Sequence, residues 1–296
     1  MRGVNLKRFR FRLRALLCGV AVIAAIAGWL GNEIYQSRVE HRAIAMVRQS
    51  GGDVRFDCSI YDVPYCDSCC TESIFRRWLR TTFGNTLFGR VRTVACGKAT
   101  NLKTISELRK LNHLVIVGFL DASLDGQIVE QLGERDRVRH VKFYRCTWNG
   151  NAFQSLATLE HIEGLEIVPV GMSRVDVSSV QGLRRLRLLK LEYATVDVDS
   201  LGKLQGISSI EHLSLRYSNC TGEFGTLKKF SQLTNLNLQG TRIGDQHVPI
   251  LAEMKQLQML DVQDTHLSED GLRELELALP RCHVTSSMSL SQNGGP

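Results

Sequence analysis

Net positive charge is almost absent from this chain of 296 residues once its first fourteen residues are set aside. Six of the 37 basic residues lie in residues 1–14, which contain no acidic residue. Residues 15–296 therefore carry 31 basic against 30 acidic side chains. A nucleic-acid-binding domain instead gathers basic side chains over one folded surface. The sequence therefore predicts no nucleic-acid partner.

The short motifs that mark common catalytic and cofactor sites are also missing. The chain has no G-x-x-x-x-G-K-[ST] phosphate loop, no G-x-G-x-x-G, no H-E-x-x-H and no G-x-S-x-G. Asp197 and Asp199 could begin a cation site, but acidic residues recur at the matching turns, which favours solvated turns. We therefore expect no enzyme, no cofactor and no bound metal.

Only residues 15–31 form a long apolar run, seventeen residues without a charge. A helix needs about 17–25 apolar residues to cross a bilayer, and Trp29 would suit the membrane interface. More basic residues precede the run than follow it closely, which places residues 1–14 in the cytoplasm and residues 32–296 outside it. We therefore expect a single-pass membrane anchor with an extracytoplasmic main body.

Two other interpretations of this run stay open. A cleaved signal peptide has the same charge pattern, and Ala25-Ile26-Ala27 resembles a cleavage site, so cleavage would follow Ala27. Apolar residues continue beyond that site to Leu30, which favours retention. A buried helix of a soluble protein would also be apolar, but six cations directly before the run disfavour it.

An internal repeat fills the second half of the chain. The unit L-x-x-L-x-L, with Ile, Val or Phe substituting for Leu, occurs seven times, and its middle residues recur every 23–27 positions. The same register reaches Val94 before the first unit and Val284 after the last. Such a repeat predicts a solenoid, in which stacked units build a core that no single unit can bury. The middle residues are Leu114, Val141, Leu165, Leu189, Leu213, Leu236 and Leu260.

A second apolar pair, with its members five residues apart, follows most units. We therefore expect each repeat to contain an alternating strand, a turn and a second apolar segment. These pairs are Leu124/Val129, Val175/Val180, Val196/Leu201, Ile243/Val248 and Leu267/Leu272. A further position after each strand varies between apolar and polar types, and we expect the earlier repeats to be less regular for that reason. It is occupied by Phe119, Cys146, Val170, Ala194, Ser218, Thr241 and Thr265.

The last repeats resemble bacterial leucine-rich-repeat proteins of the L-x-L-x-x-T-x-[IL]-x-D-x-G-L type. The segments Leu236–Asp245 and Leu260–Leu272 match that pattern closely, and Leu279–Val284 resembles its usual terminal repeat. The resemblance is strong over roughly residues 90–285 and extends to residues 1–90 in layout only. It implies an α/β leucine-rich-repeat solenoid with parallel strands on its concave face, in a single-pass protein of the bacterial envelope.

We expect five regions along the chain: 1–14, 15–31, 32–90, 91–285 and 286–296. Region 32–90 is interpreted as a linker helix closed by Gly51-Gly52, a strand over residues 54–60 and a helix over residues 73–83 that covers the first repeat. Region 91–285 holds the repeats. Region 286–296 is short and polar, and we expect it to be disordered.

Four cysteines lie within thirteen residues of the cap, and they leave three interpretations open. Outside the cytoplasm they would form structural disulfides. A C-x-x-C pair is also half of a common zinc site, and it occurs in thiol-redox proteins, although the second zinc half and the thioredoxin-like context are missing. The four are Cys58, Cys66, Cys69 and Cys70.

Strand side chains alternate, so the residues flanking each inward apolar pair point to the concave face. In the first repeat these are His113, Val115 and Val117. The middle repeats contribute mixed charges with a tyrosine and an arginine, which suits a specific protein or peptide surface. The alternatives are a thiol-redox or zinc protein and a structural envelope spacer. The candidate binding residues are His140, Lys142, Tyr144, Glu166, Lys190, Glu192, His212, Ser214, Arg216, Asn237, Gln239 and Asp261.

Overall fold

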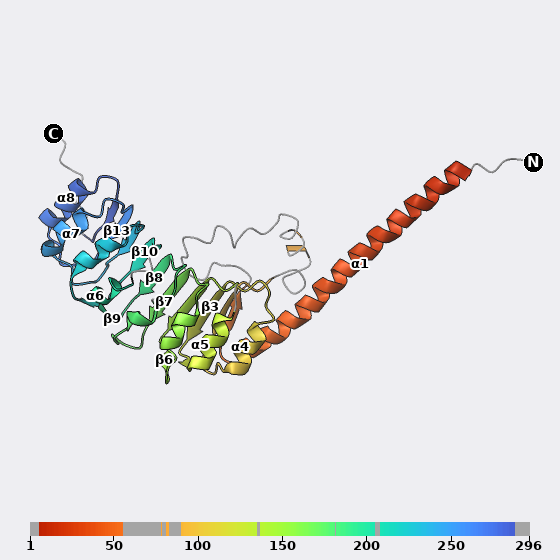
Figure 1. The fold of residues 1–296 in the computed structure, drawn as a ribbon, viewed down its shortest axis with the longest axis horizontal. Helices are drawn as coiled ribbons and strands as arrows, with labels where there is room; N and C mark the ends of the chain where they lie inside the picture. Colours follow the sequence, from red (N-terminus) through yellow and green to blue (C-terminus); the bar gives the residue numbers. More distant parts are fainter. Residues whose placement is uncertain are drawn as a thin grey trace, which may run out of the picture.

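A computed structural model describes residues 6–55, 78, 81–82, 90–134, 137–180, 182–204 and 208–287. It is an α/β leucine-rich-repeat solenoid with a long helix extending from its N-terminal end (Figure 1). One ten-stranded sheet runs through the solenoid, and every neighbouring pair is parallel except the first, β1 with β2. In sheet order the strands are β1 (Asp53–Arg55), β2 (Thr93–Cys96), β3 (Ile116–Leu120), β5 (His140–Tyr144), β7 (Gly164–Val168), β8 (Leu188–Leu191), β10 (His212–Ser214), β12 (Asn235–Asn237), β13 (Met259–Asp261) and β14 (His283–Thr285).

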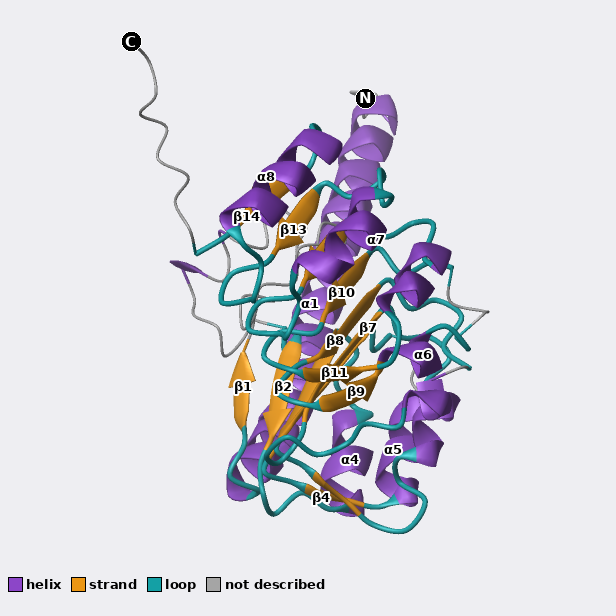
Figure 2. Cartoon of the chain, turned by 90° about the vertical axis from the view of Figure 1, so that its left-hand side faces the viewer, coloured by secondary structure: helices purple, strands orange, loops and turns teal. Residues whose placement is uncertain are grey.

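Short helices cover the side of the repeats opposite this sheet (Figure 2). Most complete only one or two turns, since each has to return the chain to the next strand. Asn101, Asp125 and Ser268 cap their helices by accepting a backbone N–H. The α-helices are α4 (Leu102–Leu108), α5 (Gly126–Gly133), α6 (Val198–Leu201), α7 (Val248–Ala252) and α8 (Glu269–Ala278); the 3₁₀ helices are η1 (Gln154–Thr158), η2 (Val177–Val180), η3 (Phe224–Lys229) and η4 (Asp245–His247).

A second set of short strands lies beside the main sheet, in the turns that follow it. β4 (Ser123–Leu124) pairs with β6 (Thr147–Trp148), and β9 (Thr195–Asp197) pairs with β11 (Asn219–Thr221), both in parallel. We call these strands, with the turn segments in register with them, the lateral ladder. The predicted apolar pairs begin in this ladder, and all five are buried.

The predicted register of the first repeat is wrong by three residues. Val141 of β5 lies opposite Val117, whereas the predicted repeat places Leu114 at that position. Val117 in turn lies opposite Val94 of β2, so the spacing becomes 23 or 24 residues throughout. Leu111 and Leu114 are buried just before the strand, and their spacing matches that of the repeat unit. The concave positions of this repeat are therefore those of Ile116, Gly118 and Leu120, and Val117 points inward.

The same shift corrects the position after the first strand. Ala122, which is buried, is the equivalent of Cys146, whereas Phe119 is an inward side chain of β3. Phe119 stacks on Phe143 of the next repeat, with ring centroids 5.3 Å apart. Val170, expected to be equivalent to Cys146, is 51% exposed. Irregularity is therefore concentrated in the third repeat.

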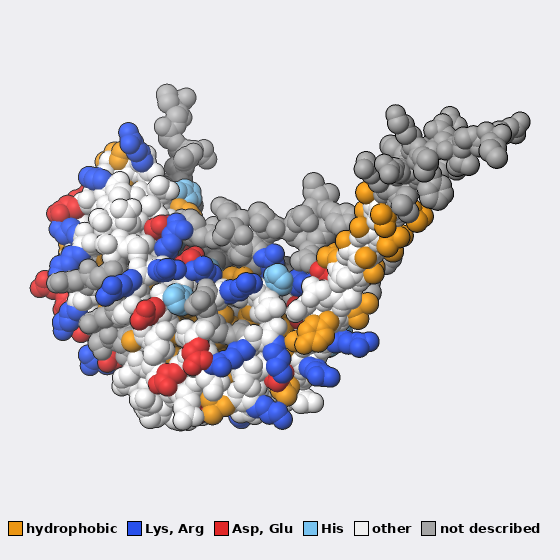
Figure 3. All heavy atoms as spheres, turned by 45° about the vertical axis from the view of Figure 1, so that its right-hand side comes forward, with side chains coloured by type: hydrophobic (Ala, Val, Ile, Leu, Met, Phe, Trp, Pro, Cys, Tyr) orange, Lys and Arg blue, Asp and Glu red, His pale blue; other side chains and the backbone are white. Residues whose placement is uncertain are grey.

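One continuous helix, α1 (Leu6–Gln49), contains both the apolar run and the expected linker helix. Its segment Ala15–Gln49 is long and apolar enough to cross a membrane, and the apolar window is fully exposed. Figure 3 shows this apolar surface as a band along the protruding helix. The helix ends as predicted: Gly51 adopts φ +78°, and the Gly52 N–H donates to the Val47 carbonyl.

The C-terminal part of α1 covers the N-terminal end of the repeats. Ala43, Ile44 and Val47 are buried there, in contact with α4, β1 and β2. Arg90 forms ion pairs with Glu33 and Glu40 of α1, and all three side chains are buried. α1 thus covers this end of the repeats, and most of the helix predicted over residues 73–83 lies outside the described residues. Only Trp78, Thr81 and Thr82 of that segment are described, and they are helical.

Candidate functional site

The candidate binding residues form rows that cross the concave sheet. The strands pair in register, so equivalent residues of successive repeats lie side by side, about 4.8 Å apart. The central row contains six of them, one each from β5, β7, β8, β10, β12 and β13. In order these are Lys142, Glu166, Lys190, Ser214, Asn237 and Asp261.

Charges alternate at the N-terminal end of this row. Glu166 lies between Lys142 and Lys190, and its carboxylate is 3.0 Å from the Lys142 Nζ atom. Tyr144 donates its hydroxyl proton to the same carboxylate. Lys142 and Glu166 are both buried. These three side chains therefore form one compact network rather than three independent contacts for a partner.

Two histidines occupy the neighbouring row. His140 lies opposite Gly164, and His212 lies opposite Leu188 and Asn235. Burial lowers the pKa of each imidazole to about 4, so both rings are neutral at pH 7. Gly164 makes room for the first ring, because a Cβ atom there would lie 2.1 Å from the His140 Nδ1 atom.

The C-terminal half of the concave face is hollowed. A groove of about 380 Å³ extends over β8, β10, β12 and β13, and it includes Thr285 of β14. Met259 is 51% exposed within it and provides an apolar contact among polar groups. Six predicted residues line this groove: Lys190, Glu192, His212, Ser214, Asn237 and Asp261.

Hydrogen bonds between repeats orient these groove residues. Ser214 donates to Glu192 at 2.7 Å, and Asn237 donates to Asp261 at 3.1 Å. Arg216 donates through Nε to the Gln239 Oε1 atom at 2.7 Å, at the margin of the groove. The arrangement offers donors, acceptors and an apolar side chain in fixed positions, as a polar peptide would require.

Sequence reasoning missed a cluster where the strands end. Tyr193 stacks on Tyr217, with ring centroids 5.3 Å apart, and Arg216 lies over the Tyr217 ring at 4.9 Å. Tyr217 also donates to Asp264, two repeats further on, at 3.0 Å. Hydrogen bonds from Gln239 and Tyr217 lower the pKa of Asp264.

The feature that indicates this cluster is a second repeated position, which lies in the turns after the strands. The residues there share a positive φ, so their side chains line one edge of the sheet. Gly240 leaves space for the Tyr217 ring, since a Cβ atom at residue 240 would lie 2.0 Å from a ring carbon. The non-glycine members of this turn position are Asp121, Arg145, Tyr193, Tyr217 and Asp264.

The cysteines in the described repeats are structural side chains. Burial raises the pKa of Cys96 and Cys220 to about 12 and that of Cys146 to about 11, so their thiols stay protonated at pH 7. Within the described parts of the chain, no group of three or more His, Cys, Asp or Glu side chains is placed to hold a metal ion. The candidate disulfide residues lie outside the described residues: Cys58, Cys66, Cys69 and Cys70.

Comparison with known proteins finds likeness in structure alone. No family model matches the sequence, and no curated protein matches it. Similar solved structures include an internalin C2 from Listeria monocytogenes, at 18% identity and a TM-score of 0.49, with 72% of this chain and 92% of that chain covered. Another is an internalin (inlF) from the same organism, at 14% identity and a TM-score of 0.47, with 65% and 58% covered.

Proposed function

We propose that this protein is a membrane-anchored recognition module that binds a protein or peptide partner on its concave face, without turnover. The hollowed half of that face carries the proposal. Its groove of about 380 Å³ is lined by oriented polar side chains from successive strands and by the exposed Met259. Such mixed, preorganised surfaces suit specific polar contacts with a partner.

The groove can be tested by site-specific photocrosslinking in the native membrane. A benzophenone amino acid at Met259 should give a discrete crosslinked product. The same label at Leu277, which is 77% exposed on α8, should give none. An additional Asn237→Arg substitution should remove the Met259 product by filling the groove. A product at Leu277 alone would contradict the assignment to the concave face.

The proposed location places residues 15–31 of α1 in the membrane and the repeats outside the cytoplasm. It is supported by the exposed apolar surface of α1 and by the basic residues that precede it in the sequence. Intact mass of protein taken from its native membrane, with thiols blocked at lysis, tests this location. A full-length mass with pairs of hydrogens missing supports an uncleaved anchor and disulfides, whereas nine blocked thiols would support a reducing compartment and the opposite topology.

A further inference from the structure

The turn of the third repeat is three residues longer than the others. From Leu124 to Trp148 the lateral ladder advances by 24 residues, but from Trp148 to Val175 it advances by 27. It then advances by only 21 to Val196. The main sheet keeps its spacing, because Leu165 and Leu189 remain 24 residues apart and opposite each other. The extra residues therefore affect only the lateral ladder.

Pro169 explains why this turn differs. Asp121, Arg145, Tyr193 and Tyr217 adopt φ near +50° at the equivalent turn position. Proline is fixed near −65° and cannot make that turn. The chain instead turns at Gly171, with φ +61°, and Val170 becomes exposed. Ser173 then donates its hydroxyl proton to the Val170 carbonyl at 2.6 Å, which closes the enlarged turn.

The longer turn leaves a gap in the lateral ladder. On one side, the N–H groups of Thr147 and Asn149 donate to the first repeat, at Ala122 and Leu124. Neighbouring residues of a parallel strand direct their backbone groups to opposite sides, so the N–H and C=O of Trp148 face the third repeat. No hydrogen bond joins Thr147–Asn149 to Ser173–Val175, both of which the structure describes.

The other side of the gap is also an open strand edge. The Ser173 carbonyl accepts from the Thr195 N–H, and the Val175 N–H donates to the Thr195 carbonyl, both at 3.0 Å. Arg174, opposite Thr195, therefore directs its own backbone groups toward the second repeat. Two strand edges thus face each other where consecutive repeats would otherwise pair directly.

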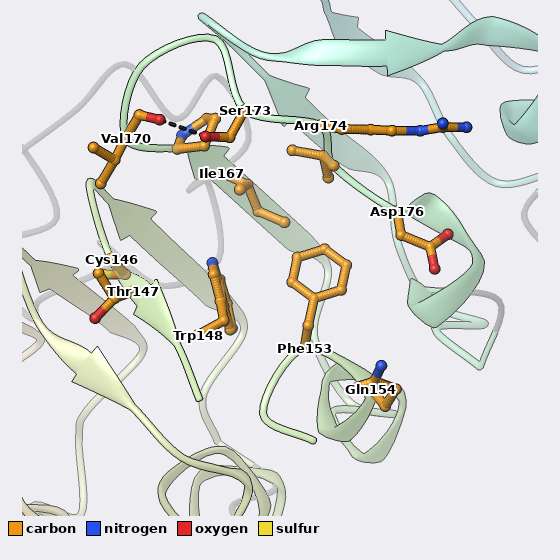
Figure 4. A pocket seen from close by; sticks show the side chains of 12 residues that line it. Cys146, Thr147, Trp148, Phe153, Gln154, Ile167, Val170, Ser173, Arg174 and Asp176 are labelled. Carbon is orange, nitrogen blue, oxygen red and sulfur yellow. Dashed lines mark hydrogen bonds between the residues drawn. The ribbon is translucent and has the colours of Figure 1, made fainter. Parts of the chain in front are cut away.

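A pocket of about 440 Å³, lined by both apolar and polar side chains, lies between these edges. Trp148 and Phe153 meet edge to face, with ring centroids 4.9 Å apart, and Ile167 and Val175 complete the apolar lining. Figure 4 shows Trp148, Phe153 and Ile167 pointing into the same space, with Arg174 at its rim. The volume falls within the range of about 300–1,000 Å³ that is usual for ligand sites.

We propose that this gap receives one extended peptide segment of a partner protein, which adds a strand between Trp148 and Arg174 and places a large apolar side chain in the pocket. Backbone hydrogen bonds would supply affinity, and the pocket would select the side chain. This site is separate from the concave face, because it opens in the turns beside the main sheet.

The probe is a library of acetylated nonapeptide amides with alternating Thr and Val, a Lys at each end, and Phe, Leu, Ile, Tyr or Trp at the centre. Binding to the full-length protein in detergent is followed by fluorescence polarisation of labelled peptides. The best binder is then resynthesised in two N-methylated series, which block alternate backbone N–H groups. A strand paired on both sides requires both sets, so each series should weaken binding at least tenfold.

Two matched variants test the edge at Arg174. Arg174→Pro removes the N–H that faces the gap, and that N–H has no partner within the described fold. Arg174→Ala removes only the side chain. We expect Arg174→Pro to weaken peptide binding at least tenfold and Arg174→Ala to leave it within twofold. Unfolding in urea checks that both variants remain folded.

The proposal is overturned if no library member binds below 1 mM, or if N-methylation and Arg174→Pro leave binding unchanged.

Discussion

The main sheet and the lateral ladder run beside each other through the same repeats, but only the main sheet is continuous. Every repeat contributes a strand to the main sheet, whereas the lateral ladder is interrupted between Trp148 and Arg174. The difference shows where this solenoid tolerates a change in length. Inward side chains of the main strands are packed on both sides by neighbouring repeats, so a shift there would expose the core. A turn can lengthen at the surface provided that the chain returns in register.

The largest effect should come from truncating a side chain that joins the two layers. Phe143 is buried beneath the main sheet, stacks on Phe119 and meets Trp148 at 4.8 Å. Phe143→Ala should lower the free energy of unfolding by about 3–5 kcal/mol. Thr147→Ala, at an exposed position of β6, should change it by no more than about 0.5 kcal/mol. Urea unfolding of the full-length protein measures both, and equal effects would contradict the comparison.

Acid should destabilise the main sheet next most strongly. His140 and His212 have pKa values near 4 in the fold because both are buried, against about 6.5 in the unfolded chain. Between these values the unfolded state binds more protons. Stability is therefore complete above pH 6.5 and is lost progressively as the pH falls toward 4.

Substitution of both histidines by glutamine tests this slope. Unfolding in urea at pH 7.0, 5.5 and 4.5 should show a shallower loss of stability for His140→Gln/His212→Gln than for the wild type. His266→Gln, at an exposed histidine in the last repeats, provides the control and should leave the slope unchanged. A wild-type curve that is flat between pH 6.5 and 4.5 would refute the predicted role of burial.

A smaller effect should distinguish two turn glycines. Gly150 adopts φ +56° with open space around it, so Gly150→Ala should cost about 1 kcal/mol through backbone strain alone. Gly240 adopts φ +66° against the Tyr217 ring, and Gly240→Ala should cost about twice as much. It should also change the near-ultraviolet circular dichroism of the stacked tyrosines, whereas Gly150→Ala should not. Equal losses with unchanged spectra would show that the ring moves freely.

The smallest effect should come from the exposed pair at the sheet edge. Arg145 donates two hydrogen bonds to Asp121, at 2.7 and 2.8 Å, and both side chains are largely in solvent. Asp121→Asn should lower the free energy of unfolding only slightly, and the difference should shrink in 1 M salt. A difference that persists in high salt would indicate a packing role instead.

The sequence was sufficient to predict the solenoid, because inward leucines must recur at the spacing of the strands. The prediction is wrong at Leu114, because the buried residues just before the first strand reproduce the spacing of the repeat unit. The repeat pattern also does not indicate the longer third turn, because the three added residues are compensated before the next strand. Only the comparison of Trp148, Val175 and Val196 reveals them.

The alternation of side chains along each strand is enough to predict which residues lie on the concave face. It does not predict which of them contact each other. Alternation puts Lys142 and Glu166 on one face, whereas their contact depends on the register between strands. The contact between Tyr217 and Asp264 spans 47 residues and crosses a glycine whose missing side chain makes it possible. No periodic pattern of residue types contains that information.

The unbroken course of α1 has a mechanical consequence. Its packed stripe begins at Glu33, two residues after the apolar run ends, and reaches Val47 without a glycine or proline between them. A helix of 44 residues is about 66 Å long and bends only slightly. In the proposed membrane setting, α1 acts as a lever that runs without a break from the apolar run to the repeats. Tilting or rotating the membrane segment would therefore swing the concave face through the same angle, and the bilayer would set the direction in which the module meets its partner.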